Sequence, residues 1–103
     1  MTVEEQLEFV RQSCTREDRL CQLAEECAEL SQAALKLRRA IWDTNPTPVT
    51  TERANDMVEE ETLDVCLCLA ALDLATLGDM AGHPRLKAKL ARWVERLEEA
   101  KND

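Results

Sequence analysis

The chain has 103 residues, enough for one domain with one modest core, and we expect a single domain over residues 1–103. Its formal net charge of -8 repels nucleic-acid backbones on average, and no basic stripe with interleaved aromatic residues appears, so nucleic-acid binding is not expected. No apolar run reaches the ~20 residues that a membrane span requires, so we expect no membrane partner.

The residue composition favours an all-α fold. Two glycines, three prolines, one Phe, two Trp and no Tyr leave Leu, Ala, Val, Met and Cys to build the core, which is typical of a helix bundle rather than a β-sandwich or barrel. Because a helical chain this short often buries more surface by self-association, we expect oligomerisation to complete the bundle.

The cysteines are odd in number, and no signal peptide precedes them, so we expect a cytoplasmic protein with reduced thiols. They show no convergent zinc-ligand pattern, and we interpret them as small core residues. They are Cys14, Cys21, Cys27, Cys66 and Cys68.

Two helices are predicted in the first part of the chain. The first begins at Thr2, which has capping-box spacing with Glu5. Thr15 and Asp18 form a second cap signal, and a long helix follows from about residue 16 to residue 42. Its 3,4,3,4 apolar spacing is typical of a bundle seam. The apolar positions are Leu20, Leu23, Cys27, Leu30, Ala34, Leu37 and Ile41.

Two more helices are predicted after the stretch TNPTPVT (44–50), whose prolines hold the chain extended. One runs from about residue 51 to residue 77, and its second half is apolar nearly all round, which predicts burial on several sides. Gly78 and Gly82 bracket a turn, and Pro84 suits the first turn of a last helix that ends near Ala100. The residues expected to face inward there are Leu86, Leu90, Trp93 or Val94, and Leu97. We therefore expect two long antiparallel helices plus two shorter ones.

Acidic residues three apart occur on both long helices, as Glu26 with Glu29 and Glu61 with Asp64. Residues at this spacing differ by ~60° and ~4.5 Å, so two carboxylates can converge on one cation. The spacing alone is not specific. We interpret two further Glu-x-x-Glu pairs, at positions 5 and 8 and at positions 95 and 98, as solvated acids.

The heights of the two acidic pairs agree. Each pair lies ~20 Å from the connecting loop at 1.5 Å per residue, so antiparallel packing brings them level. Four facing carboxylates are the arrangement of di-cation sites in helix bundles, and oxygen ligands favour Mg²⁺ or Mn²⁺. The alternative is a set of surface acids paired with Arg and Lys.

The sequence resembles the MazG-like nucleotide pyrophosphohydrolases of the all-α NTP pyrophosphatase superfamily. The likeness covers roughly residues 16–78 and lies in LAEECAELSQAALKLRRA, NPTPVT and EEETLDVCLCLAAL. The family pattern is E-E-x-x-E on one helix and E-x-x-D on the next. It falls here on Glu25, Glu26 and Glu29, and on Glu61 and Asp64.

The resemblance implies a Mg²⁺-dependent enzyme that converts a (d)NTP and water into the (d)NMP and pyrophosphate. It implies metal ligands at Glu26, Glu29, Glu61 and Asp64, and we expect Glu29 also to orient or deprotonate the water. It also implies a homodimer or a dimer of dimers.

Three further residues are candidates for substrate contact, each with a structural alternative. Lys36, on the strip of Glu29, and Arg39 are candidates for phosphate contact or ordinary surface cations. Asn45, in the loop, is a candidate for nucleotide contact or a structural cap.

Two other functions remain open. One is a non-enzymatic helical interaction module that keeps the fold. The other is a relative acting on a different phosphorylated substrate, such as phosphoribosyl-ATP.

Overall fold

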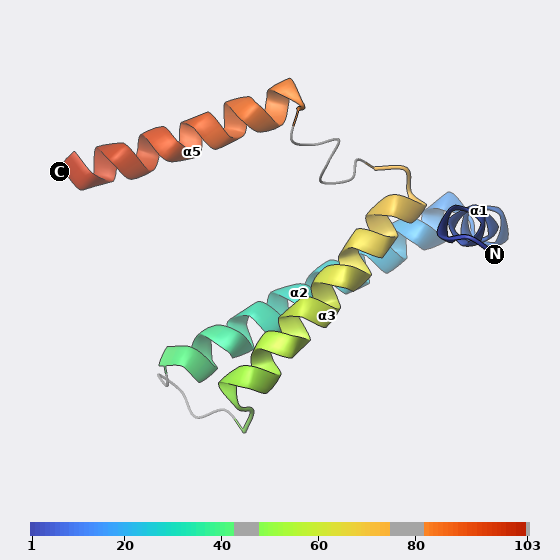
Figure 1. The fold of residues 1–103 in the computed structure, drawn as a ribbon, viewed down its shortest axis with the longest axis horizontal. Helices are drawn as coiled ribbons and strands as arrows, with labels where there is room; N and C mark the ends of the chain where they lie inside the picture. Colours follow the sequence, from blue (N-terminus) through green and yellow to red (C-terminus); the bar gives the residue numbers. More distant parts are fainter. Residues whose placement is uncertain (43–47, 75–81, 103) are drawn as a thin grey trace.

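The computed structural model describes residues 1–42, 48–74 and 82–102, which form four helices and no strand (Figure 1). The helices are α1 (Val3–Ser13), α2 (Arg16–Trp42), α3 (Thr51–Ala71) and α5 (Pro84–Asn102). The all-α class predicted from composition is therefore confirmed. Within the described ranges, no helix is long and apolar enough to cross a membrane.

The first two helices begin where the sequence predicts them, because short-range hydrogen bonds fix both starts. The Thr2 hydroxyl accepts a bond from the Glu5 N–H at 3.1 Å, and the Thr2 N–H donates to Glu5 Oε1 at 3.4 Å. The Thr15 hydroxyl accepts from the Asp18 N–H at 3.1 Å. Each cap satisfies an N–H that has no partner inside the helix.

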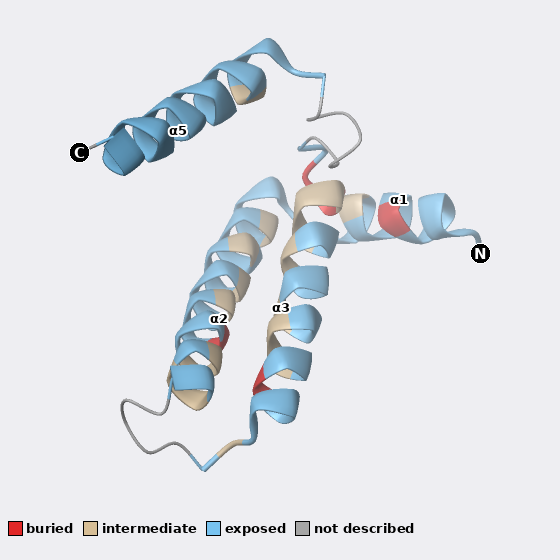
Figure 2. Cartoon of the chain, turned by 60° about the vertical axis from the view of Figure 1, so that its left-hand side comes forward, coloured by how far each residue is buried: buried red, intermediate tan, exposed pale blue. Residues whose placement is uncertain are grey.

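Helices α2 and α3 lie side by side and antiparallel (Figure 2). At one end the Thr51 hydroxyl donates to the carbonyl of Ala40 at 3.3 Å, and at the other the Arg19 guanidinium donates to the carbonyl of Ala71. Ala33 and Ala54 are buried between the two helices. Such small side chains let the helix backbones approach closely.

The face that α2 turns toward α3 overlaps the predicted seam in part, because Leu23, Leu30 and Leu37 are half-buried while the other seam positions are exposed. Leu20 and Ile41 remain 42% and 50% exposed, while Ala33, outside the predicted seam, is only 3% exposed. Cys27 and Ala34 are also exposed. The helix is rotated so that the strip containing Glu26 and Ala33 faces inward.

Helix α3 ends at Ala71, six residues before the predicted end. The N–H of Asp73 donates to the carbonyl of Ala70 at 3.1 Å, and the N–H of Leu74 donates to that of Leu69 at 2.9 Å. Asp73 has a φ of 58°, so these bonds form a Schellman motif with Asp73 in the left-handed region. Gly78, predicted in the next turn, lies outside the described residues.

Two arginines from other helices cap the carboxyl end of α3. Arg11 Nη2 donates to the carbonyl of Ala70 at 2.8 Å and lies 3.0 Å from Asp73 Oδ1. Arg19 binds the next carbonyl, that of Ala71. The last turn of α3 contains no basic residue of its own. The arginines of α1 and α2 therefore supply the positive charge that a helix carboxyl end favours.

Replacing Arg19 by Ala is expected to lower the free energy of unfolding by about 1–3 kcal/mol, because the carbonyl of Ala71 loses a charged donor. Denaturant unfolding followed by circular dichroism measures this change. Arg53→Ala is the control, since the one ion pair of Arg53 among the described residues is an exposed one with Glu60, and its effect should stay within about 0.5 kcal/mol. Equal effects of the two substitutions would show that the Arg19 cap contributes nothing.

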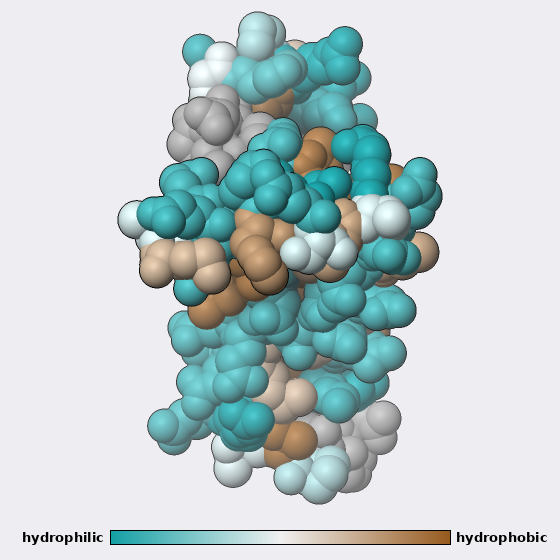
Figure 3. Space-filling model, turned by 90° about the vertical axis from the view of Figure 1, so that its right-hand side faces the viewer, coloured by the Kyte–Doolittle hydropathy of each residue, from teal (hydrophilic) through white to brown (hydrophobic). Residues whose placement is uncertain are grey.

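Much apolar surface predicted to be internal is exposed in the single chain. Leu63 and Leu67 on α3 are 69% and 60% exposed, against the burial expected there. No residue of α5 is buried, and α5 lies apart from the paired helices in Figures 1 and 2. Hydrophobic side chains also interrupt the hydrophilic surface around α1 (Figure 3). These side chains are exposed because α1, α2 and α3 cover only one side of one another.

The interpretation of the cysteines as core residues is wrong for four of them. Cys14, Cys21, Cys27 and Cys66 are exposed, and only Cys68 is partly buried. All five are free thiols. The rotation of α2 explains Cys27, since the predicted seam would have placed it against α3.

Candidate metal centre

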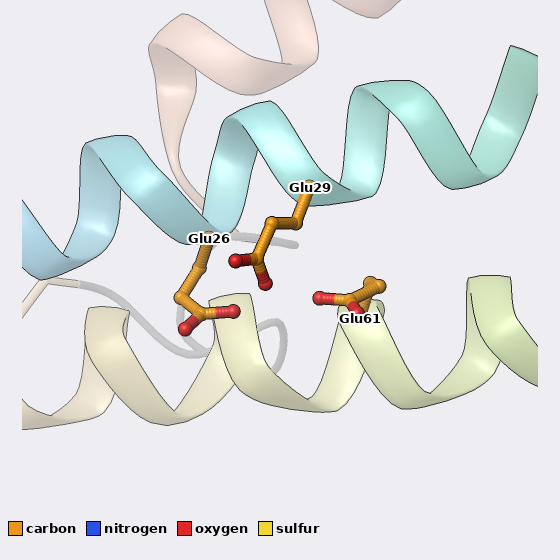
Figure 4. Close-up of side chains that lie close together, drawn as sticks. All are labelled: Glu26, Glu29 and Glu61. Atoms are coloured by element: carbon orange, nitrogen blue, oxygen red, sulfur yellow. The ribbon is translucent and has the colours of Figure 1, made fainter.

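Three carboxylates meet between α2 and α3 (Figure 4). Glu26 and Glu29 come from α2 and Glu61 from α3, and one oxygen of each lies within 4.8 Å of the others. Ligand oxygens at about 2.1 Å from a Mg²⁺ ion lie about 3–4 Å apart, so small side-chain rotations suffice to bring these oxygens around one ion. We refer to these three residues as the carboxylate cluster.

The burial of the carboxylate cluster is uneven. Glu26 and Glu61 are half-buried, whereas Glu29 is exposed. Glu26 Oε2 and Glu61 Oε2 are inaccessible to solvent, and neither finds a hydrogen-bond partner among the described residues. Buried polar atoms are nearly always paired, because an unpaired one costs free energy. A bound cation would give both oxygens the partner that the protein does not.

Gln22 supports the carboxylate cluster from one turn earlier on α2. Its Nε2 donates to Glu26 Oε1 at 2.7 Å, so the other oxygen of Glu26 is the unpaired one. Sequence reasoning gave Gln22 no role, although it precedes Glu26 by four residues and side chains at that spacing are neighbours on a helix.

The pKa of Glu26 is raised above the ordinary value of a glutamate. Burial is the main cause, and the nearby Glu29 and Asp64 raise the pKa further, while the hydrogen bond from Gln22 acts in the opposite direction. The metal-free site therefore disfavours a full set of ionised carboxylates. A divalent cation would remove this repulsion and favour the ionised form.

Asp64, the fourth expected ligand, is exposed and does not belong to the carboxylate cluster. Its charge nevertheless raises the pKa of Glu26, which places it at the edge of the site. The neighbouring Cys68 has a thiol pKa raised by burial and then by the charges of Glu26 and Asp64. Cys68 is therefore a protonated neighbour of the site that sequence reasoning did not include.

The candidate phosphate contacts lie further along α2. Lys36 and Arg39 are half-buried, and neither pairs with a carboxylate among the described residues. Lys36 is seven residues beyond Glu29, which is about 10 Å along the same side of the helix. Asn45 lies outside the described residues.

An apolar cleft opens on the side of the carboxylate cluster away from Lys36, where α1 crosses the first turns of α2 and the last turns of α3. Its volume is about 260 Å³. It is lined by Leu7, Val10, Cys14, Asp18, Arg19, Gln22, Leu67, Cys68 and Ala71. Gln22 lines this cleft and connects it to Glu26 through its hydrogen bond.

The acids at the remaining sequence matches are exposed, as predicted. Glu5 caps α1 and Glu8 pairs with Arg11 at 3.3 Å, while Glu95 and Glu98 lie on α5. Among the described residues, only the acidic pairs at Glu26 and Glu29 on α2 and at Glu61 and Asp64 on α3 face a helix that carries further carboxylates.

Comparisons of the chain with protein-family models, with curated proteins and with solved structures find no match. The function is therefore inferred from the chemistry of the carboxylate cluster and its surroundings.

Proposed function

We propose that the protein is a Mg²⁺-dependent nucleoside triphosphate pyrophosphohydrolase that converts a (d)NTP and water into the (d)NMP and pyrophosphate. The observation that carries this proposal is the carboxylate cluster with its two buried, unpaired oxygens. A site made only of carboxylate oxygens suits Mg²⁺, with Mn²⁺ as a substitute, better than softer metals.

Each acid has a role in this proposal. Glu26 and Glu61 would hold Mg²⁺, and Asp64 would assist them. Glu29, the exposed member of the cluster, would also bind the metal and would orient the attacking water or accept its proton. Bound Mg²⁺ would supply positive charge for the triphosphate and lower the pKa of the water. This charge is needed because the protein itself carries -8.

The order of groups along α2 matches the order of parts in a nucleoside triphosphate, from the nucleoside to the outer phosphates. The apolar cleft at Gln22 comes first, then Glu26 and Glu29, then Lys36. With the α-phosphate at the carboxylate cluster, the nucleoside lies in the cleft and the outer phosphates extend toward Lys36 and Arg39. Apolar walls with a few polar groups are typical of small-molecule sites. This arrangement supports a nucleotide substrate over bare cation binding.

We further propose that the active form is a homodimer or a dimer of dimers. Supporting this are the exposed apolar side chains on α3 and α5, which a single chain leaves in water. Large exposed apolar surface is typical of interaction sites.

The test is pyrophosphate release from a panel of NTPs and dNTPs, with Mg²⁺ and with EDTA. We expect release from one or a few of them that requires Mg²⁺. Release that persists in EDTA would contradict the metal role.

No release from any nucleotide would contradict the proposed reaction, and Mg²⁺ titration by calorimetry then separates the alternatives. Binding without release would favour another phosphorylated substrate, such as phosphoribosyl-ATP. The absence of both would favour a non-enzymatic helical interaction module.

A further inference from the structure

Helix α5 differs in charge from the rest of the protein. Residues 84–102 carry a net charge of +3, whereas all 103 residues carry -8, so the remaining residues carry -11. The helix therefore has an electrostatic preference for the surface of α1, α2 and α3. Its basic residues are Arg85, Lys87, Lys89, Arg92, Arg96 and Lys101.

The side chains of α5 are sorted into an apolar stripe and a basic edge. The stripe is formed by Leu86, Leu90, Trp93 and Leu97, which recur every three or four residues and share one side of the helix. Leu90, Trp93 and Leu97 are 53%, 62% and 55% exposed. The basic edge consists of Lys89, Arg92 and Arg96, which border a shallow hollow beside Trp93.

The outer face of α3 has the complementary arrangement. Leu63 follows Glu61 by two residues, about 200° round the helix, so it lies opposite the carboxylate cluster. Leu63 and Leu67 are one turn apart and strongly exposed, and Leu67 also borders the apolar cleft at the end of this face. Exposed acids share the same side of α3 at Asp56, Glu59 and Glu60. We refer to these three acids with the two leucines as the acidic face.

We propose that α5 of one copy packs on the acidic face of a second copy, and that α5 of the second copy packs in the same way on the first. We refer to this reciprocal packing as the exchange. The lengths agree, because 19 residues of α5 span about 28 Å and 21 residues of α3 span about 31 Å. The apolar stripe would cover Leu63 and Leu67, and the basic edge would meet the acids. Two copies that each carry -8 repel each other overall, so a contact between opposite charges is where they can associate.

A second copy fits better than the protein's own α3. Helix α5 lies apart from its own α3 in both ribbon views (Figures 1 and 2). Reciprocal exchange forms a closed dimer in which each α5 and each acidic face is used once. This proposal rests on the homodimer of the proposed function and names its contact, and it does not depend on hydrolysis.

Charge reversal tests the exchange by molecular mass. The α5-reversed variant has Lys89→Glu, Arg92→Glu and Arg96→Glu, and the α3-reversed variant has Asp56→Lys, Glu59→Lys and Glu60→Lys. Light scattering after size exclusion should give the wild type twice the 11.7 kDa mass of one copy. Each variant should be monomeric alone, because its homodimer brings like charges together. Their equimolar mixture should regain the dimer mass, since α5 and α3 of opposite charge then meet in both contacts.

The mixture separates docking on a second copy from docking on the protein's own α3. Intramolecular docking predicts that the mixture stays monomeric, and that result would overturn the exchange. A monomeric wild type, or reversed variants that remain dimeric alone, would also overturn it. The Glu29→Gln variant should retain the dimer mass, because Glu29 belongs neither to α5 nor to the acidic face. This result is expected even if no hydrolysis is ever detected.

A second measurement uses Trp93 and does not require the reversed variants to fold fully. In a Trp42→Phe background Trp93 is the only tryptophan. Its emission should lie at shorter wavelength in the otherwise wild-type protein than in the same protein with Leu63→Asp and Leu67→Asp, because the exchange covers it. Emission typical of a solvent-exposed tryptophan in both proteins would overturn the proposal.

Discussion

Replacing Glu29 by Gln is expected to lower the rate of pyrophosphate release about 1000-fold, within the range for loss of a general base. Glutamine keeps the size of the side chain but cannot accept the proton from water, and it removes one of the three charges that converge within 4.8 Å. The measurement is kcat with saturating Mg²⁺ and the best substrate of the panel. Circular dichroism should show unchanged helix content, because Glu29 is exposed.

Glu98→Gln is the matched control, since it makes the same chemical change on an exposed residue of α5. We expect no more than a small change in kcat. Full turnover by Glu29→Gln would mean that the carboxylate cluster is not the catalytic site. A large loss from Glu98→Gln would place the essential acids elsewhere.

Replacing Glu26 by Gln is expected to raise the thermal midpoint of the metal-free protein at neutral pH and to remove the stabilisation by Mg²⁺. Folding raises the pKa of Glu26, so the folded state binds its proton more tightly than the unfolded state. This contribution to stability is full below the unfolded pKa and is lost as the pH rises through the folded pKa. Glutamine is uncharged, so the variant does not lose this stability as the pH rises.

Magnesium should reverse this pH dependence in the wild type, because it binds the ionised carboxylates. A ligand at one hundred times its Kd adds about 2.7 kcal/mol to stability. Scanning calorimetry with Mg²⁺ and with EDTA, across acidic to neutral pH, measures both effects. If the Glu26→Gln protein gained as much from Mg²⁺ as the wild type, Glu26 would not be a ligand.

Local sequence signals were sufficient wherever the deciding contacts are local. The Thr2 and Thr15 caps join residues three apart, so the starts of α1 and α2 could be predicted from a few neighbouring letters. The end of α3 could not be predicted in this way. It depends on Asp73 in the left-handed region and on Arg11 and Arg19, which lie 59 and 52 residues away in sequence from the carbonyls that they bind.

The sequence by itself determined that the protein is helical and that acids three apart lie on one side of a helix, because both follow from backbone geometry. Only the tertiary structure decided which face of α2 is buried, since the Ala33 strip rather than the Ala34 strip faces α3. That rotation brings Glu26 and Glu29 to Glu61, and Asp64 does not join these three. The physical reason is that burial depends on the neighbour. One amphipathic pattern fits several rotations, and the packing of α2 against α3 selects one of them.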